Sequence, residues 1–238
     1  MREDRSLQQD VYGVVIEWIH QAKLRPGDRV SEAAIARFLG ISRGPVREAI
    51  SRLDYEGLVT RRPRRGAVVS EFTVKDIEDI ASTRQLIEGH AARSACTLIE
   101  PTEVEELHVL IDSMKIAAEA GQWTETALLN GRFHQTVVRI SGNKILGKMW
   151  QTLHPLAWLL APMVSPNTPH DPESLVVRHE ELIDVLRAGD PDRAEAAFHQ
   201  HVLRSSQMTM AWVAPKLAGN GSTPGLDDGQ AAISMRQR

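Results

Sequence analysis

The strongest constraint on the fold lies near the N-terminus, where two short amphipathic helices are separated by a single tight turn. Ser31 can cap the first helix, whose apolar residues recur at helical spacing, and Gly40 ends it. Ser42 begins the second helix two residues later. The apolar positions of this second helix lie on one face, at Val46, Ile50 and Leu53. Two short helices joined by a glycine-containing turn are typical of a helix-turn-helix.

The segments on either side of these helices extend the motif. Residues 7–23 carry apolar side chains densely enough to predict a largely buried helix, which the turn at Pro26 ends. Further along, two short β-rich runs at 58–60 and 67–69 flank a turn. The turn region holds four arginines: Arg61, Arg62, Arg64 and Arg65. This pattern predicts a β-hairpin wing, and therefore a winged helix-turn-helix domain over residues 1–72.

The second short helix is the candidate recognition helix, because its N-terminal end carries hydrogen-bond donors. Arg43 and Arg47 lie four residues apart and project from the face opposite the apolar one. An arginine fork can bond two acceptors of one guanine, while Ser42 can cap the helix or bond a phosphate. The hairpin adds phosphate or minor-groove contacts. The predicted DNA-binding set is Ser42, Arg43, Arg47, Arg64, Arg65 and Gly66, with Arg61 as a further candidate.

Arginines on a helix do not by themselves indicate DNA binding. Arg43 and Arg47 could form a solvated helix face, with Arg47 paired to a neighbouring acid. The short preceding helix, the tight turn and the arginine-rich hairpin together favour the DNA-binding interpretation. The charge distribution points the same way, since residues 1–75 carry a net charge of +4 and residues 76–238 a net charge of −7.

The rest of the chain is predicted to be helical. The expected helices are 74–98, 102–120, 123–140, 143–162, 172–188 and 191–213. Residues 73–213 therefore form a predicted all-α helical bundle, and the fold class is mostly α. Residues 214–238 lack hydrophobic periodicity and are predicted to be a disordered tail.

Composition predicts a cytoplasmic, globular protein that does not insert into a membrane. The hydrophobic content is 42% and the charged content is 25%. The longest apolar runs, such as residues 156–164, fall far short of the roughly 20 residues that cross a bilayer. Charged residues precede any apolar stretch at the N-terminus, so no secretory signal is expected. The single cysteine, Cys96, is expected to be ordinary packing in a reducing compartment.

Three histidines of the helical region lie on apolar helix faces. His134 follows Asn130 by one turn, so these two side chains can converge on one point. His179 and His201 each share a helix face with small or branched apolar residues. Three inward imidazoles and an oxygen ligand can hold a divalent transition ion. A buried histidine is also commonly just hydrogen-bonded packing, and the residues alone do not select these three over His154 or His199.

The motifs resemble those of a known family. The run from Gly27 to Glu32, the run from Gly40 to Ile50, residues 53–58 and residues 65–69 resemble the GntR family of winged-helix regulators. The region from Asp76 onward is similar to the all-helical FCD effector domain of the FadR subfamily. The resemblance covers about residues 1–212. It implies a homodimeric repressor or activator that binds a short double-stranded DNA palindrome and responds to a small carboxylate-bearing effector, and we expect a repressor.

The resemblance also implies a metal site and an effector site. Many FCD domains bind a metal through one aspartate and three histidines, and that pattern falls on Asn130, His134, His179 and His201. The asparagine departs from the family pattern, because a neutral amide is a weaker ligand than a carboxylate. Zinc or nickel suits these ligand types best. Arg84 and Arg132 are the candidate effector-binding residues, with Arg139 a further candidate; Arg84 could instead pair with Glu88.

A second departure from the family pattern concerns the DNA contacts, and rival functions remain open. Some relatives carry an arginine where this chain has Ala33, so its DNA-contact set is expected to be smaller.

Three histidines could belong to a hydrolytic metalloenzyme, but the chain lacks an HExxH or comparable motif to supply a general base. A third possibility is a metal-free regulator whose histidines bond an anionic effector. The leading expectation is a ligand-responsive regulator and not an enzyme.

Overall fold

The computed structural model describes residues 2–20, 23–159 and 172–219. The chain divides into two compact units, one containing residues up to Phe72 and the other containing Thr73–Leu217. Among the described residues, no helix has the length and apolar character needed to cross a membrane. The two units are described separately below.

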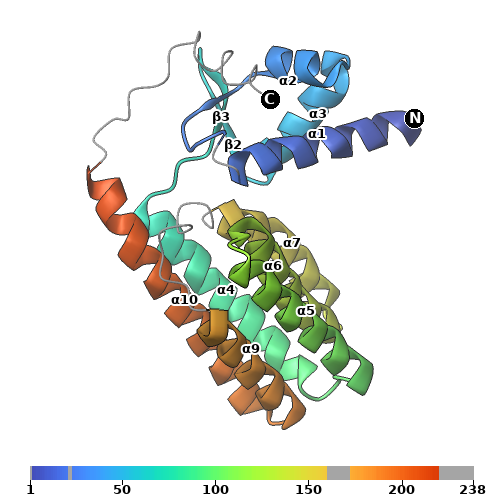
Figure 1. Ribbon diagram of the computed structural model, residues 1–238, viewed down its shortest axis with the longest axis vertical. Helices are drawn as coiled ribbons and strands as arrows, with labels where there is room; N and C mark the ends of the chain where they lie inside the picture. Colours follow the sequence, from blue (N-terminus) through green and yellow to red (C-terminus); the bar gives the residue numbers. More distant parts are fainter. Residues whose placement is uncertain (1, 21–22, 160–171, 220–238) are drawn as a thin grey trace. The chain divides into compact units, whose positions relative to one another are not determined.

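The N-terminal unit combines helices with a small antiparallel sheet (Figure 1). Its helices are α1 (Arg2–His20), α2 (Glu32–Leu39) and α3 (Arg43–Tyr55). Its strands are β1 (Arg29–Val30), β2 (Val59–Arg62) and β3 (Gly66–Val69), in the order β1-β3-β2. The register pairs Val59 with Val69 and Arg62 with Gly66, so β2 and β3 form the predicted hairpin. This arrangement is a winged helix-turn-helix.

Local chemistry explains the tight turn between α2 and α3. The Ser31 hydroxyl accepts a hydrogen bond from the Ala34 backbone N–H, as expected for an N-cap. Gly40 ends α2 with a φ of 67°, a left-handed conformation that glycine adopts without strain. Ser42 occupies the N-cap position of α3, but its side chain makes no capping hydrogen bond. The Ser42 hydroxyl therefore remains available to a phosphate.

The core of this unit fixes the orientation of α3. The inward face of α3 is completely buried, and α3 packs against α1, α2 and β2. The fully or almost fully buried residues of the core include Val11, Val15, Ile35, Val46, Ile50, Leu53, Leu58 and Val69. Because the apolar face of α3 is held against the core, its opposite face is presented to solvent.

The C-terminal unit is an all-α bundle (Figure 1). Its helices are α4 (Val74–Ala95), α5 (Pro101–Glu119), α6 (Trp123–Ile140), α7 (Lys144–Leu159), α9 (Pro172–Arg187) and α10 (Pro191–Gly219). Helix α6 packs against α4, α5 and α7, and α5 also packs against α9. The main hydrophobic core is built around Phe133, Phe198, Leu107, Ile111, Met114 and Ile183.

The structure departs from the sequence-based expectations at one additional strand and at the end of the last helix. Strand β1 was not predicted, and it exists because Arg29 and Val30 pair with β3. The predicted disordered tail begins too early, because α10 continues to Gly219. Loss of one N–H at Pro215 removes a single helical hydrogen bond, and the helix continues past it. The remainder of the predicted tail, residues 220–238, lies outside the described residues.

Two helical glycines of the bundle are expected to respond in opposite ways to alanine. A Cβ at Gly89 would lie 2.3 Å from the His199 ring, whereas a Cβ at Gly147 would meet nothing within 4 Å. Gly147→Ala is expected to raise the free energy of unfolding by about 0.5–1 kcal/mol through helix propensity. Gly89→Ala is expected to lower it by about 1–2 kcal/mol, because overpacking outweighs that gain. Urea unfolding of both variants tests this. Equal changes in the free energy of unfolding for the two variants would contradict the close approach of α4 and α10.

Candidate functional site

The exposed face of α3 carries the two predicted base-reading arginines. Arg43 lies at the first position of α3 and is exposed, with no side-chain partner among the described residues. Arg47 is also exposed, but its Nε lies 3.6 Å from Glu32 Oε2. An ion pair this exposed contributes little stability, so it leaves Arg47 able to exchange Glu32 for DNA. The structure therefore shows both the solvated face and the neighbouring acid that the sequence left as an alternative.

The four arginines of the hairpin fall into two pairs. Arg61 donates to Ser51 Oγ at 3.0 Å and lies 3.4 Å from Asp54, while Arg62 pairs with Glu71 at 2.5 Å. These two side chains brace the hairpin against its own domain. In contrast, the two arginines at the tip have no side-chain partner within the part of the chain that the structure describes. These are Arg64 and Arg65, both exposed.

The tip of the hairpin also has a constrained backbone. Arg64 has a φ of 64° and Gly66 a φ of 74°, and the Arg65 N–H bonds the Arg62 carbonyl. A left-handed conformation is unusual for a residue with a Cβ. The turn thus leaves both tip side chains exposed to solvent beside the glycine.

The three predicted histidines converge inside the helical bundle. His134 from α6, His179 from α9 and His201 from α10 each offer a ring nitrogen, and these atoms all lie within 4.8 Å of one another. His134 and His179 are 1% and 2% exposed. Residues far apart in the sequence therefore form one compact imidazole cluster, which we call the histidine cluster.

An outer carboxylate and an outer carbonyl oxygen lie against two of these imidazoles. His134 Nδ1 lies 2.7 Å from Glu88 Oε2, and His179 Nδ1 lies 2.8 Å from the Leu175 carbonyl oxygen. A carboxylate and a carbonyl only accept, so each Nδ1 carries the proton and each Nε2 is left for the cluster. Both ring nitrogens of His134 are buried, and neither has an aligned hydrogen-bond partner among the described residues; Nδ1 has the close contact with Glu88, and Nε2 has none. A buried ring nitrogen with a free lone pair is able to bind a ligand or an ion.

The contact between His179 and Asn130 also fits a cation. His179 Nε2 lies 2.8 Å from Asn130 Oδ1. With its proton on Nδ1, His179 presents a lone pair at Nε2, and the amide oxygen presents another. Two acceptors at this distance are stabilised either by a cation that both bind or by a reversed amide that donates to Nε2. The donor set of three imidazoles and one amide oxygen fits a divalent transition metal.

Burial keeps two of the three histidines neutral, which is the state that binds metals. Burial and the neighbouring His134 lower the pKa of His179 to about 3. Burial, followed by the neighbouring His179 and His134, also lowers the pKa of His201. A neutral imidazole has a lone pair to donate, so no proton needs to be displaced when an ion binds near pH 7.

The sequence predicted Glu88 only as a possible partner of Arg84, and its contact with a histidine of this site was missed. Its side chain is 1% exposed and lies between His134 and Arg84, whose Nε is 2.7 Å from Glu88 Oε1. Burial raises the pKa of Glu88, but the Arg84 guanidinium and the neighbouring His134 outweigh it and lower the pKa to about 2. The available signal was its position on the buried stripe of α4 with Ala81 and Ala92, where a carboxylate requires partners.

The two predicted effector-binding arginines are not brought together. Arg84 is near the histidine cluster, close enough for its charge to lower the pKa of His201 further. Its guanidinium lies 5.7 Å from the centre of the Trp150 ring, and its side chain is 16% exposed. Arg132 is exposed and lies two residues before His134, about 200° around the helix axis. It therefore projects away from the cluster.

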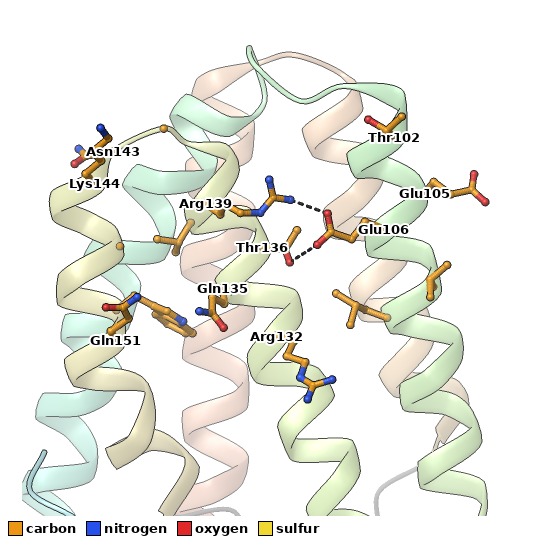
Figure 2. Close-up of a pocket in the computed structure, with 16 residues that line it drawn as sticks. Thr102, Glu105, Glu106, Arg132, Gln135, Thr136, Arg139, Asn143, Lys144 and Gln151 are labelled. Atoms are coloured by element: carbon orange, nitrogen blue, oxygen red, sulfur yellow. Dashed lines mark hydrogen bonds and ion pairs between the residues drawn. The ribbon is translucent and has the colours of Figure 1, made fainter. Parts of the chain in front are cut away.

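Arg132 instead lines an open groove of about 920 Å³ between α5, α6 and α7 (Figure 2). Arg139 lines the same groove and pairs with Glu103 and Glu106 at 3.0 and 2.7 Å. Thr136 donates to Glu106 as well, so the acidic side chains of α5 hold this part of α6 in place (Figure 2). Arg139 is thus paired with two acidic side chains of α5 in this groove.

Comparison with protein families matches both units. Residues 7–69 match the family described as bacterial regulatory proteins, gntR family, and residues 79–204 match the FCD domain. A "probable D-xylose utilization operon transcriptional repressor" of Paenarthrobacter nicotinovorans is 32% identical over 197 residues, covering 83% of this chain and 86% of that protein. The "HTH-type transcriptional repressor RspR" of Escherichia coli (strain K12) is 28% identical, with 85% and 89% covered.

Solved structures show the same fold. Escherichia coli McbR/YncC superposes with a TM-score of 0.73 at 22% identity, covering 86% of this chain and 97% of that chain. A GntR transcriptional regulator from Rhodococcus sp. RHA1 also gives a TM-score of 0.73, at 23% identity, covering 87% and 98%. The family and its curated members are transcription regulators and not enzymes, which excludes the metalloenzyme alternative. The chain belongs to the GntR family of DNA-binding transcription regulators, with an FCD domain following its winged helix-turn-helix.

Proposed function

We propose that this regulator is a metal-dependent repressor whose operator affinity changes when a small carboxylate binds in the FCD domain. Arg43 and Arg47 read base edges in the major groove, Ser42 bonds a phosphate, and the hairpin tip adds contacts from Arg64, Arg65 and Gly66. The two curated relatives described above are named repressors, which supports this sign of regulation. The proposal places the protein in the cytoplasm with the DNA that it binds.

The metal site of the proposal consists of His134, His179 and His201, with Asn130 as the fourth ligand. The observation that carries it is the convergence of three ring nitrogens within 4.8 Å in a buried cluster, in which His134 Nε2 has no hydrogen-bond partner among the described residues. Zinc or nickel suits three imidazoles and one oxygen. When bound, such an ion supplies a positive centre for an anionic effector. The neutral amide of Asn130 leaves that positive charge less compensated than an aspartate would.

Arg84 is the effector-binding residue that best fits this geometry. Glu88 occupies its Nε, and the guanidinium has further N–H donors on its terminal nitrogens. A carboxylate held by those donors can lie between Arg84 and the ion. Arg132 does not share this location, so the proposal assigns the effector to Arg84 and the histidine cluster alone.

Metal analysis of protein purified without an affinity tag tests the metal-dependent form of this function. We expect about one zinc or nickel ion per chain by inductively coupled plasma mass spectrometry. The alternative is the metal-free regulator, in which the histidines bond the effector directly. Absence of stoichiometric metal, together with an intact operator response to a small organic acid, would establish that alternative and exclude ours.

The proposal also requires a homodimer, because a palindromic operator presents two half-sites roughly one helical turn apart. Bound effector would change the separation or orientation of the two recognition helices and thereby the operator affinity. Light scattering after size-exclusion chromatography is expected to give twice the chain mass of 26.5 kDa. If the protein is a monomer in solution and still binds the full palindromic operator with full affinity, this requirement is contradicted.

The hairpin tip is expected to control the salt dependence of DNA binding. Arg64→Ala and Arg65→Ala each remove one phosphate contact per chain, so each should reduce the slope of log K against log salt by about 1 per lost contact. The loss should be similar on operator and unrelated DNA, because phosphates carry no sequence information. Arg61→Ala, which removes a guanidinium already bonded to Ser51 and Asp54, serves as the matched control. Fluorescence anisotropy over a salt series measures all three variants, and an unchanged slope for the tip variants would remove the wing from the contact set.

A further inference from the structure

Glu88 is a buried carboxylate that the metal-ligand set does not include. It lies on α4 at 1% exposure, with Oε1 2.7 Å from Arg84 Nε and Oε2 2.7 Å from His134 Nδ1. Burying a carboxylate costs several kcal/mol unless its oxygens are paired. Oε1 accepts a hydrogen bond from Arg84, and Oε2 lies in close contact with a ring nitrogen of the histidine cluster, without the alignment of a full hydrogen bond. This position therefore requires a charged acceptor and excludes an ordinary core residue.

The two contacts of Glu88 set the proton on His134. Arg84 never accepts, so it keeps Glu88 ionised and accepting, and the ionised carboxylate in turn requires a proton on His134 Nδ1. With that proton on Nδ1, the neutral ring carries its lone pair on Nε2. That nitrogen is buried, and no described residue forms a hydrogen bond with it. A carboxylate that holds the outer nitrogen of a metal-binding histidine fixes its tautomer and ring orientation.

We infer that Glu88 is a positioning residue that holds His134 with its Nε2 lone pair in the histidine cluster, and that links this imidazole to Arg84. This inference rests on the proposed metal function, since it concerns a ligand of the same site. It adds that one carboxylate joins the metal-binding His134 to the effector-binding Arg84. Metal and effector are therefore expected to act on each other through Glu88.

The variant that tests this most sharply is Glu88→Gln, which keeps the shape but replaces one acceptor by a donor. Because Arg84 can only donate, the glutamine must turn its oxygen toward Arg84 and its NH2 toward His134. The NH2 group then requires a lone pair on Nδ1, which moves the proton to Nε2 and occupies the nitrogen that binds the ion. Glu88→Asp keeps a carboxylate and is expected to retain the proton on Nδ1.

Zinc binding is the first readout, measured on the full chain by competition with a chromogenic chelator. Glu88→Gln is expected to weaken the zinc affinity by about 10–100-fold, the usual effect of losing such an outer partner. Glu88→Asp should retain a higher affinity than Glu88→Gln. Glu78→Gln, an exposed change on the same helix, is the control and should bind like the wild type. Equal zinc affinity for Glu88→Gln and the wild type would overturn the inference.

The second readout needs no metal, so it separates this inference from the proposed function. In long-range 1H–15N spectra of the metal-free protein, His134 of the wild type should carry its proton on Nδ1, and His134 of Glu88→Gln on Nε2. The His134→Ala spectrum assigns the signal. If the wild type binds no zinc but its Nδ1 is protonated as expected, the proposed function fails and the positioning role stands. If His134 Nδ1 of the wild type is unprotonated, the inference is wrong. If Glu88→Gln does not fold, Glu88→Asp takes its place, and an unprotonated His134 Nδ1 in that variant would also make the inference wrong.

Discussion

Removing one imidazole of the histidine cluster is expected to abolish metal binding. His179→Ala should lose zinc affinity by more than the 10–100-fold effect expected for an outer partner, because it deletes a direct ligand. In the wild type, zinc at about 1,000 times its dissociation constant adds about 4 kcal/mol to the free energy of unfolding. For a domain of this size that corresponds to a rise in Tm of roughly 8–16 °C. Scanning calorimetry with zinc and then with a chelator measures this difference.

Comparing the Tm of each variant with zinc and with a chelator separates the loss of metal binding from any packing defect. His179→Ala also removes buried atoms, so its Tm without metal will fall, but its Tm should not respond to zinc or to the chelator. His90→Ala replaces an exposed histidine of α4 and should respond like the wild type. A zinc-dependent rise of the same size in His179→Ala would show that the ion binds elsewhere.

Arg43→Ala is expected to cause the largest loss of operator affinity among the surface arginine variants. Arg43 is exposed at the start of α3 and has no side-chain partner among the described residues, so its donors are free for DNA. Loss of a base-reading arginine should cost about 1–3 kcal/mol per half-site, or roughly 5–150-fold. Affinity for unrelated DNA should fall much less, because base contacts carry the specificity. Anisotropy titrations with double-stranded DNA from the chain's own promoter region measure both losses.

Two further variants calibrate the effect of Arg43. Arg47→Ala is expected to cause a loss of operator affinity in the same range. That loss should be smaller by the free energy that Arg47 spends when it leaves its ion pair with Glu32. Arg193→Ala removes the same charge from an exposed position of α10 in the FCD domain and should leave operator affinity unchanged. Equal losses on operator and unrelated DNA for Arg43→Ala would make it a phosphate contact and would contradict its reading of a base.

The winged helix-turn-helix was predictable because its signals are local. The N-cap at Ser31, the left-handed Gly40 and the apolar face of α3 are each set by residues within a few positions of one another. Strand β1 was not predictable in the same way. Two residues are too few to show an alternating pattern, and Arg29 and Val30 become a strand only by pairing with Val68 and Ala67.

The histidine cluster was only partly predictable. Helical spacing places His134, His179 and His201 on inward faces, but nothing in spacing brings three helices to one point. The contact of Glu88 with His134 joins residues on two different helices and has no local signal. Arg132 shows the opposite case, since its offset from His134 already places it on the other side of α6. Helical geometry would therefore have removed it from the effector site.

The most direct test of the metal-dependent repressor is the operator affinity of zinc-loaded protein with and without a small carboxylate. A thermal-shift screen of small mono-, di- and hydroxycarboxylic acids first selects the acid, and anisotropy titration with promoter DNA then gives both dissociation constants. We predict that the acid weakens operator binding by at least about 5-fold, the lower end of typical coupling between sites. The change should vanish in His179→Ala. Equal operator affinities of the wild type with and without a bound acid would contradict the account.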